Sequence, residues 1–195
     1  MSAVVTDDDG RVTRIVAGTA GGRQIAVPPA GTRPTSDRVR EAVFSALEAR
    51  IDLDGARVLD LYAGSGALGL EALSRGAAHA RFVEFDRRAA AVLRRNIADL
   101  ALPGAEITVA PVETVLAERP QLPSDVTLLD PPYALDDAAL ARVLATLVDG
   151  GWLAPGALLV VERSARSAVP TWPAGVVAIA ERRYGDTRVH YGSAP

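Results

Sequence analysis

The residues best suited to chemistry form a short corner, Asp130-Pro131-Pro132-Tyr133, directly after the apolar run "VTLL". Proline has no backbone N–H and its ring holds φ at about −65°, so two consecutive prolines make a rigid corner that is rich in hydrogen-bond acceptors. A carboxylate beside such a corner suits an exocyclic amino group, because both N–H groups of the amine find an acceptor. The alternative interpretation is a structural turn with an acidic cap.

An amino group on an aromatic ring is a poor nucleophile, because its lone pair is delocalised into the ring. If the Asp130 carboxylate and the Pro131 carbonyl each accept one N–H, the lone pair is aimed at an electrophilic carbon instead. Tyr133 would stack on the base, and stacking of about 1–3 kcal/mol offsets much of the cost of extruding a nucleotide. The sequence therefore predicts catalysis by positioning, with the catalytic set Asp130, Pro131, Pro132 and Tyr133.

A second candidate site is a glycine loop within "DLYAGSGALGLEALSRGA". Gly64, Gly66 and Gly69 have the spacing G-x-G-x-x-G between an expected strand and an expected helix, which allows a tight turn and close approach to a ligand. Glu84 lies 20 residues after Gly64, at the end of the next strand, where a carboxylate accepts hydrogen bonds from ribose hydroxyls. These features are typical of both NAD and S-adenosylmethionine sites, and a plain tight turn is the remaining alternative.

Two aspartates flank these features. Asp60 ends the strand before the loop, where its charge could hold the amino end of an amino-acid-like cofactor and would repel a pyrophosphate. Asp60 thereby favours S-adenosylmethionine, although a cap or a loop hydrogen bond is its alternative role. The role of Asp86 has two alternatives: it is either a solvated loop residue or a second contact to the ribose or to the loop.

Beyond Gly55, short apolar segments alternate with amphipathic ones, which predicts parallel strands covered by helices on both faces. Strands are expected in 57–63, 81–86, 107–111, 125–130 and 157–163, and helices in 67–76, 87–100, 112–120 and 136–151. Two alternating runs in 175–192 predict a C-terminal antiparallel hairpin. The expected fold is α/β, a Rossmann-like doubly wound sheet of seven strands, mostly parallel, that ends in this hairpin.

Upstream of the sheet, residues 11–28 predict a small β-hairpin, and residues 35–51 predict an amphipathic helix with a Thr/Ser N-cap. We divide the chain into an acidic tail expected to be disordered (1–10), an N-terminal hairpin extension (11–34) and a main domain (35–195).

The net charge is −3, yet residues 11–50 carry seven arginines against three acidic residues, a local charge of +4. This patch suits nucleic acid. Every cation is arginine, which reflects either bidentate phosphate contacts or genomic base composition.

The composition excludes several classes of function. The chain has no cysteine and two isolated histidines, so disulfides, thiolate chemistry and a metal site are not expected. No apolar run reaches the roughly 18 residues of a membrane span, and the N-terminal residues are acidic where a secretory signal is basic and then apolar. With 49% hydrophobic residues the chain can bury a core, and a cytoplasmic location is expected.

The glycine loop, "FVEFD", "LLDPPY" and the final hairpin together resemble class I S-adenosylmethionine-dependent methyltransferases that act on exocyclic amines. The segment "RIVAGTAGGRQIAVPPAGTRPTSDRVREAVFSAL", followed by "AGSGALGLEALSRGA", is similar in particular to the RsmD type, bacterial 16S rRNA (guanine-N2)-methyltransferases. The resemblance runs from about Arg14 to about Tyr191. It implies S-adenosylmethionine as cofactor, and as substrate the 2-amino group of a guanine in small-subunit rRNA, within a partly assembled 30S particle and reached by a monomer.

The resemblance also implies roles for single residues. Asp60, Gly64 and Gly66 would contact the methionine part of the cofactor, Glu84 the ribose and Val112 the adenine, while Thr35 and Asp37 would help close the site. The full set expected to bind cofactor is Thr35, Asp37, Asp60, Tyr62, Ala63, Gly64, Gly66, Glu84, Asp86, Val112 and Asp130. The arginines expected to face RNA are Arg14, Arg23, Arg33, Arg38 and Arg40. One departure is Pro111, which stands where many relatives have a polar residue able to bond the adenine amine.

Other functions remain open at this point. The same corner serves adenine-N6 in DNA or a glutamine amide in a protein. An NAD-dependent oxidoreductase fits the glycine loop, and a non-catalytic RNA-binding factor fits the basic segment, although the intact "DPPY" speaks against the last.

Overall fold

A computed structural model of the chain describes residues 12–28 and 36–195, so the expected acidic tail, Arg33 and Thr35 lie outside the described residues. The helices are Asp37–Glu48 (α1), Ala67–Ser74 (α2), Arg87–Leu100 (α3), Val112–Leu116 (α4) and Asp137–Asp149 (α5). The strands are Val12–Arg14 (β1), Gln24–Ala26 (β2), Arg57–Leu61 (β3), His79–Val83 (β4), Ala105–Thr108 (β5), Ser124–Leu129 (β6), Leu153–Ser164 (β7), Val177–Tyr184 (β8) and Thr187–Ser193 (β9).

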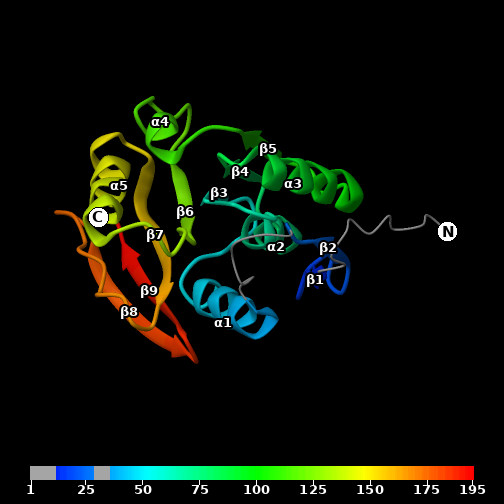
Figure 1. Ribbon diagram of the computed structural model, residues 1–195, viewed down its shortest axis with the longest axis horizontal. Helices are drawn as coiled ribbons and strands as arrows, with labels where there is room; N and C mark the ends of the chain where they lie inside the picture. Colours follow the sequence, from blue (N-terminus) through cyan, green and yellow to red (C-terminus); the bar gives the residue numbers. More distant parts are fainter. Residues whose placement is uncertain (1–11, 29–35) are drawn as a thin grey trace.

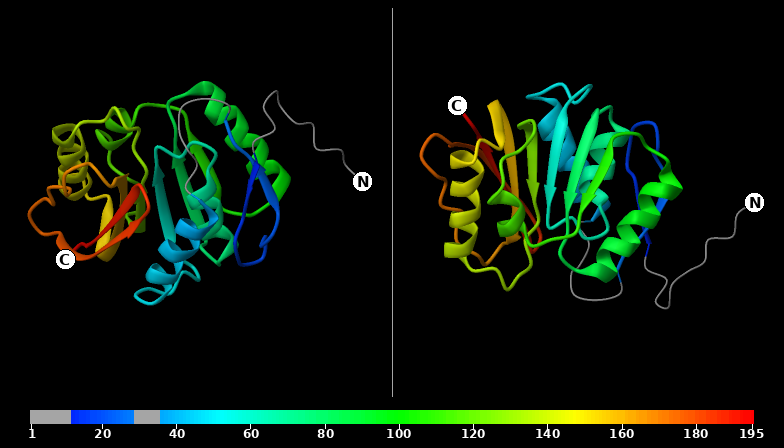
Figure 2. Two further views of the ribbon diagram at one scale, coloured as in Figure 1. Left: turned by 60° about the horizontal axis from the view of Figure 1, so that its bottom comes forward. Right: turned by 90° about the horizontal axis from the view of Figure 1, so that it is seen from above.

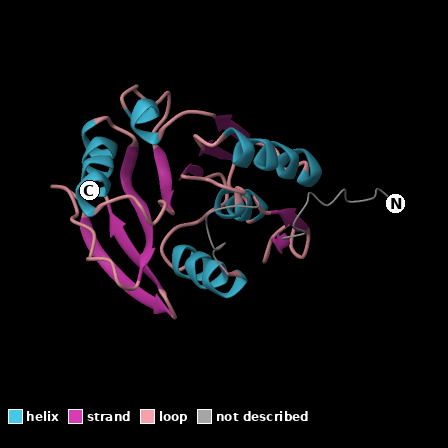
Figure 3. Ribbon diagram, in the orientation of Figure 1, coloured by secondary structure: helices cyan, strands magenta, loops and turns pink. Residues whose placement is uncertain are grey.

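Seven of the strands form one sheet in the order β5-β4-β3-β6-β7-β9-β8 (Figures 1 and 3). Strands β3 to β7 run parallel, and β9 is antiparallel to both β7 and β8. This confirms the expected doubly wound, mostly parallel sheet with a C-terminal antiparallel hairpin. Because the chain leaves β3 toward β4 on one side and returns to β6 on the other, the order reverses between β3 and β6, where ligands bind in such sheets.

The pleat of the central strands divides their apolar side chains between two cores. Val58, Val126 and Val160 face one core, which is closed by apolar residues of α1, α2 and α3. Leu59 and Val161 face the other, which is closed by α4 and α5. Figure 1 shows the two groups of helices on opposite sides of the sheet, and Figure 2 gives two further views of this layering. Strands buried on both faces explain why the sequence reads as continuous apolar runs.

Several boundaries differ from the expected ones. Strand β5 ends at Thr108, three residues early, because the following residues leave the sheet and Pro111 occupies the N-cap position of α4. Strand β7 begins at Leu153 and includes a register shift opposite Ser124 and Val126. Within residues 12–28 and 36–195, no helix has both the length and the apolar character that crossing a membrane requires.

The hairpin β1-β2 packs onto the main sheet's helices. Ile15 and Ile25 are each at most 2% exposed and belong to the same core as α1, α2 and α3. The Asn96 side chain of α3 pairs with both backbone groups of Ala26, at 2.9 Å each. Both carboxylate oxygens of Glu71, from α2, accept from the hairpin, from Val16 N at 2.7 Å and from Ala17 N at 3.0 Å. The extension is therefore fastened to α2 and α3 by buried polar contacts as well as by apolar packing.

Arg40 lies at the centre of this attachment. Its side chain is fully buried, and its guanidinium reaches Asp37 Oδ1 at 2.9 Å, Thr13 Oγ1 at 3.2 Å and the Arg14 carbonyl. Its Nε lies 3.7 Å from Glu71 Oε2. The prediction that Arg40 faces RNA is therefore wrong, because a fully buried guanidinium that bridges α1, α2 and the hairpin has no free surface to offer a phosphate.

Arg38 serves as the control for Arg40, because both lie on α1 and Arg38 is exposed whereas Arg40 is buried. We expect Arg40→Met to lower the free energy of unfolding by about 3–5 kcal/mol, because it removes the buried donor to Asp37 and to the hairpin and one of the two cations beside Glu71, the other being Arg75 at 2.8 Å. Arg38→Met should change it by less than about 0.5 kcal/mol. Urea unfolding of both variants measures the difference, and equal losses would contradict the role given to Arg40.

Candidate active site

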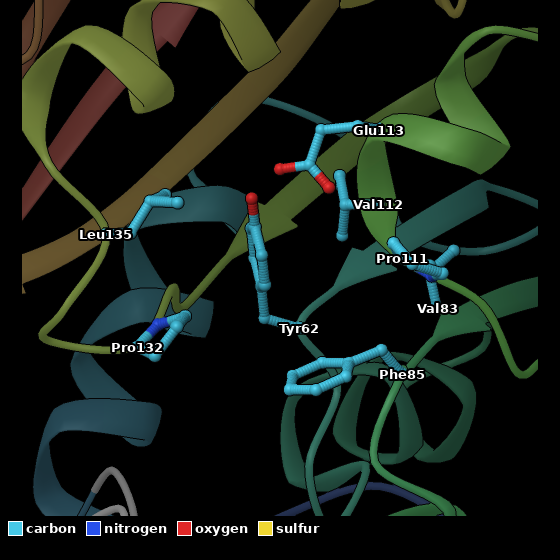
Figure 4. A pocket seen from close by; sticks show the side chains of 8 residues that line it. All are labelled: Tyr62, Val83, Phe85, Pro111, Val112, Glu113, Pro132 and Leu135. Carbon is cyan, nitrogen blue, oxygen red and sulfur yellow. The ribbon is translucent and has the colours of Figure 1, made fainter.

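Two hollows open at the carboxyl edge of the parallel strands, on either side of the corner that follows β6. The first has a volume of about 250 Å³ and is mostly apolar (Figure 4). Its lining residues are Tyr62, Val83, Phe85, Pro111, Val112, Glu113, Pro132 and Leu135. They come from the segments that follow β3, β4, β5 and β6, so the hollow spans the point where the strand order reverses.

The glycine loop is held open beside this hollow by Glu84. Glu84 Oε2 accepts from Gly64 N at 2.8 Å, and Oε1 accepts from Asp86 N at 2.8 Å. Gly64 has φ +55°, and the nearest atom to a Cβ placed there would be the Tyr62 carbonyl oxygen at 4.0 Å. The outer side of the loop is therefore open space, over which a ligand can lie close to the backbone.

Asp60 braces the same loop from inside. It is 1% exposed, and its Oδ2 accepts from Gly69 N at 2.9 Å. A Cβ at Gly69 would lie 2.3 Å from the Phe82 ring and 3.0 Å from Asp60 Oδ2, so only glycine lets α2 approach β3 and β4 this closely. The geometry gives Asp60 the loop hydrogen bond of its alternative role, and its expected contact to the amino end of a cofactor stays a prediction.

Burial raises the pKa of Asp60 to about 8; the hydrogen bond from Gly69 opposes this rise and the charge of Glu84 adds to it. A carboxyl with this pKa is largely protonated at neutral pH. It therefore acts as a structural group and adds little negative charge to the loop.

Tyr62 supplies a donor to the first hollow. It is one of two non-glycine residues with positive φ among the described residues, at +64°. Figure 4 shows the ring among the other lining side chains, with the hydroxyl on the side of Glu113. That hydroxyl is buried, and within the described part of the chain it has no hydrogen-bond partner. Burial, with the charge of Glu113 adding to it, raises the pKa of Tyr62, so the hydroxyl keeps its proton.

The second hollow is polar and lies on the other side of the corner. Its lining residues are Asp130, Pro131, Tyr133, Glu162, Arg163, Ser164, Ser167 and Thr187. Pro132 lines the first hollow while its two neighbours line the second, so the corner is the wall between them. The carbonyl of Pro132 accepts from Leu135 N at 2.9 Å, which fixes the turn behind the wall. Tyr133 is 68% exposed, so its ring is accessible for stacking.

The sequence and the architecture are matched in known proteins. A family described as "Conserved hypothetical protein 95" matches residues 13–193. The Ribosomal RNA small subunit methyltransferase D of Escherichia coli strain K12 is 42% identical over 162 residues, covering 83% of this chain and 79% of that protein. The protein of the same name from Haemophilus influenzae is 36% identical, covering 83% and 84%. The chain belongs to this methyltransferase family.

A solved structure agrees with this assignment. The structure described as a putative methyltransferase, yhhF, from Escherichia coli superimposes with a TM-score of 0.85 at 35% identity and covers 94% of this chain and 98% of that one. The methyltransferase fold expected from the sequence is thereby confirmed.

The residues of this methyltransferase fit an S-adenosylmethionine molecule at the first hollow. The apolar walls provided by Phe85 and Val112 suit an adenine ring, the Glu84 carboxylate lies beside the open loop at Gly64, and the unpaired Tyr62 hydroxyl can donate to a ligand. Phe85, which is 65% exposed, was not in the expected set. Its signal in the sequence is an aromatic residue directly after the acidic end of a strand, in "FVEFD".

Three other expected cofactor contacts have structural partners. Ala63 N donates to the Val83 carbonyl at 3.0 Å, and Gly66 is the N-cap of α2 with φ +80°. Asp86 is the N-cap of α3, where its side chain accepts from Arg88 N at 2.8 Å. Their contacts to a cofactor stay predictions.

Asp37 is engaged with the hairpin. Its carboxylate accepts from Thr13 Oγ1 at 2.9 Å and from Arg14 Nε at 2.8 Å. Burial alone would raise the pKa of Asp37, but these two hydrogen bonds and the charge of Arg40 outweigh it and lower the pKa below its ordinary value. Asp37 therefore joins α1 to β1, and the prediction that it closes the cofactor site stays untested.

The basic segment divides into free and occupied arginines. Arg38 is exposed, and Arg14 is 63% exposed although paired with Asp37. Arg23 donates to the carbonyls of Leu100, at 2.8 Å, and Asp99, at the end of α3, so its guanidinium serves as a helix C-cap.

Asp60 gives the stability a specific pH dependence. Since its pKa is about 8 in the folded chain and 3.8 is the ordinary value, the folded state holds the proton more tightly, and stability is lost as the pH rises from about 4 to about 8. We expect this carboxyl to contribute a slope of at most about 1.4 kcal/mol per pH unit. Asp60→Asn keeps an acceptor for Gly69 N and should flatten the profile. Urea unfolding from pH 5 to 8.5 measures it, and parallel profiles for wild type and variant would contradict the assignment.

Proposed function

We propose that the protein transfers a methyl group from S-adenosylmethionine to the exocyclic 2-amino group of a guanine in 16S (small-subunit) rRNA, giving N2-methylguanosine. The observation that carries this proposal is the Asp-Pro-Pro wall between an apolar hollow of about 250 Å³, suited to the cofactor, and a small polar hollow of about 20 Å³, so that a base would lie over the polar hollow against the exposed Tyr133 ring. The names of the curated relatives support small-subunit ribosomal RNA as the substrate.

The cofactor, when bound, supplies an electrophilic methyl carbon on a sulfonium. In the proposed arrangement Phe85 and Val112 enclose its adenine, Glu84 accepts from the ribose hydroxyls, and the open backbone at Gly64 lies against the methionine part. Tyr62 donates its otherwise unpaired hydroxyl hydrogen to an acceptor of the bound molecule. Pro111 offers no side-chain acceptor for the adenine amine, so recognition there depends on packing and on backbone groups.

The corner formed by residues 130–133 positions the 2-amino group of the guanine for attack on the methyl carbon. The Asp130 carboxylate and the Pro131 carbonyl each accept one N–H of the 2-amino group, which turns the nitrogen lone pair toward the neighbouring hollow across Pro132. The exposed Tyr133 ring stacks on the flipped base and offsets part of the cost of extruding it. The new N–C bond replaces the bond between the methyl carbon and sulfur. The positive charge that passes to nitrogen is stabilised by the adjacent Asp130 carboxylate, and the nitrogen then loses one N–H proton to that carboxylate or to water.

The RNA lies against the basic segment. In this proposal residues 11–34 are the RNA-facing extension, residues 35–195 the catalytic domain, and the protein acts as a monomer on a partly assembled particle in the cytoplasm. Arg38 and Arg14 offer exposed guanidinium groups for phosphates, and Arg33 is proposed with them. Arg23 contributes by fixing the hairpin to α3.

Small subunits from cells that lack the gene test the reaction. With methyl-labelled S-adenosylmethionine, the protein should incorporate label into 16S rRNA, and nucleoside mass analysis should identify N2-methylguanosine. Asp130→Ala should lower kcat by about 100-fold or more, because it removes a positioned electrostatic group, while the cofactor Kd stays within about twofold.

The matched control for this variant is Asp149→Ala, which removes an exposed carboxylate at the end of α5. It should leave turnover and cofactor affinity unchanged. Label in N6-methyladenosine or in ribosomal protein would redirect the proposal to a different amine. Normal turnover by Asp130→Ala would remove the catalytic role of the corner.

The proposed RNA surface can be tested by measuring how the affinity for the particle depends on salt concentration. Arg38→Ala should raise the KM for the particle and reduce the slope of log affinity against log salt by about one unit, since one phosphate contact is lost. Arg119→Ala, an exposed arginine beyond α4 near the start of β6, is the control, because it lies at the opposite edge of the sheet from the corner. Identical salt slopes for the two variants would place the RNA elsewhere.

A further inference from the structure

We propose that Glu162 determines which base is accepted, by taking a hydrogen bond from the ring N1–H of guanine next to the reacting amine. This inference rests on the proposed function. It adds a residue to the substrate site that the motif itself does not contain.

The register of β6 and β7 brings Glu162 beside the corner. Leu128 pairs with Val160 in the parallel ladder, and both side chains face the same core. Two residues further along each strand, the pleat returns to the same face, so Asp130 and Glu162 point to that face from neighbouring strands, about 4.8 Å apart. Both line the polar hollow.

Glu162 and Arg163 are the two charged residues of β7 that border the hollow beside Asp130. Arg163 is 8% exposed, and its Nη2 donates to Asp137 Oδ1 of α5 at 2.9 Å. Ser164 and Thr187 contribute hydroxyls, which both donate and accept. The hollow therefore combines two carboxylates with adaptable hydroxyl groups.

This arrangement matches one base among those with an exocyclic amine. Guanine carries its 2-amino group next to a ring N1–H, so one edge presents adjacent N–H donors to two adjacent carboxylates. In adenine and cytosine the ring nitrogen next to the amine is an acceptor, and its lone pair would face the Glu162 carboxylate. Such a site selects guanine by a hydrogen bond and rejects the others by repulsion.

The test replaces the target guanine by an analogue whose N1 accepts a hydrogen bond instead of donating one. Once the methylated guanine has been located, small-subunit RNA is assembled with 2-aminopurine at that position. 2-Aminopurine keeps the 2-amino group, but its N1 is an acceptor. Wild-type protein should methylate this RNA about 10- to 100-fold more slowly, as kcat/KM, than the guanine RNA.

Glu162→Gln separates the N1 contact from other effects of the analogue. The amide can donate an N–H to N1 of 2-aminopurine, so the variant should lose rate on guanine RNA and raise the ratio of 2-aminopurine to guanine by about tenfold or more. Loss of O6 in the analogue affects both proteins equally. Glu118→Gln, an exposed carboxylate beyond α4, is the matched control and should leave the ratio unchanged.

The outcomes distinguish the two proposals. Equal rates of the wild type on both RNAs, or an unchanged ratio in Glu162→Gln, would overturn the role of Glu162 while leaving guanine methylation intact. A wild type that places no methyl group on guanine would overturn the proposed function itself. If Glu162→Gln fails to bind the cofactor in calorimetry, Glu162→Ala takes its place: without the carboxylate the rates on the two RNAs should move closer together, and an unchanged ratio would overturn the role of Glu162.

Discussion

Two carboxyl groups from neighbouring strands hold the turn between β3 and α2, and the position of the apolar hollow depends on them. Asp60 binds Gly69 N from inside the sheet, and Glu84 binds Gly64 N from the end of β4. A turn rich in glycine would otherwise have many conformations, since glycine loses more freedom on ordering than any other residue. The residues on either side of Glu84, Val83 and Phe85, line the hollow, so one carboxylate fixes both the loop and the wall facing it.

The strand order explains why one corner can serve two hollows. Strand β6 lies between β3, which carries the glycine loop, and β7, which carries Glu162. The residues after β6 therefore have the apolar hollow on one flank and the polar hollow on the other. Two prolines suit this position because a wall between two ligands has to keep its shape when either is absent, and φ is fixed at both residues.

Much of the fold, and the glycine loop with Glu84 beside it, could be predicted because they depend on local patterns. Apolar strands, amphipathic helices and the spacing of Gly64, Gly66 and Glu84 are visible in single segments. The error at Arg40 came from treating charge as a surface property. Arg40 precedes Phe44 by four residues and Leu47 by seven, so it shares their buried helical face, whereas Arg38 lies on the opposite side. The roles of Asp60 and Glu162 depend on pleat and register between strands distant in sequence, which no local pattern reveals.

The attachment of the hairpin bears on how the proposed enzyme finds its target. Glu71 and Asn96 tie the extension to α2 and α3, and α2 follows directly from the glycine loop. The extension and the glycine loop are therefore joined through packed elements. Phosphate contacts carry no sequence information but fix register and orientation. In this arrangement the arginines bring one nucleotide to the corner, and Glu162 then tests its chemistry, so position and base identity are selected by different parts of the chain.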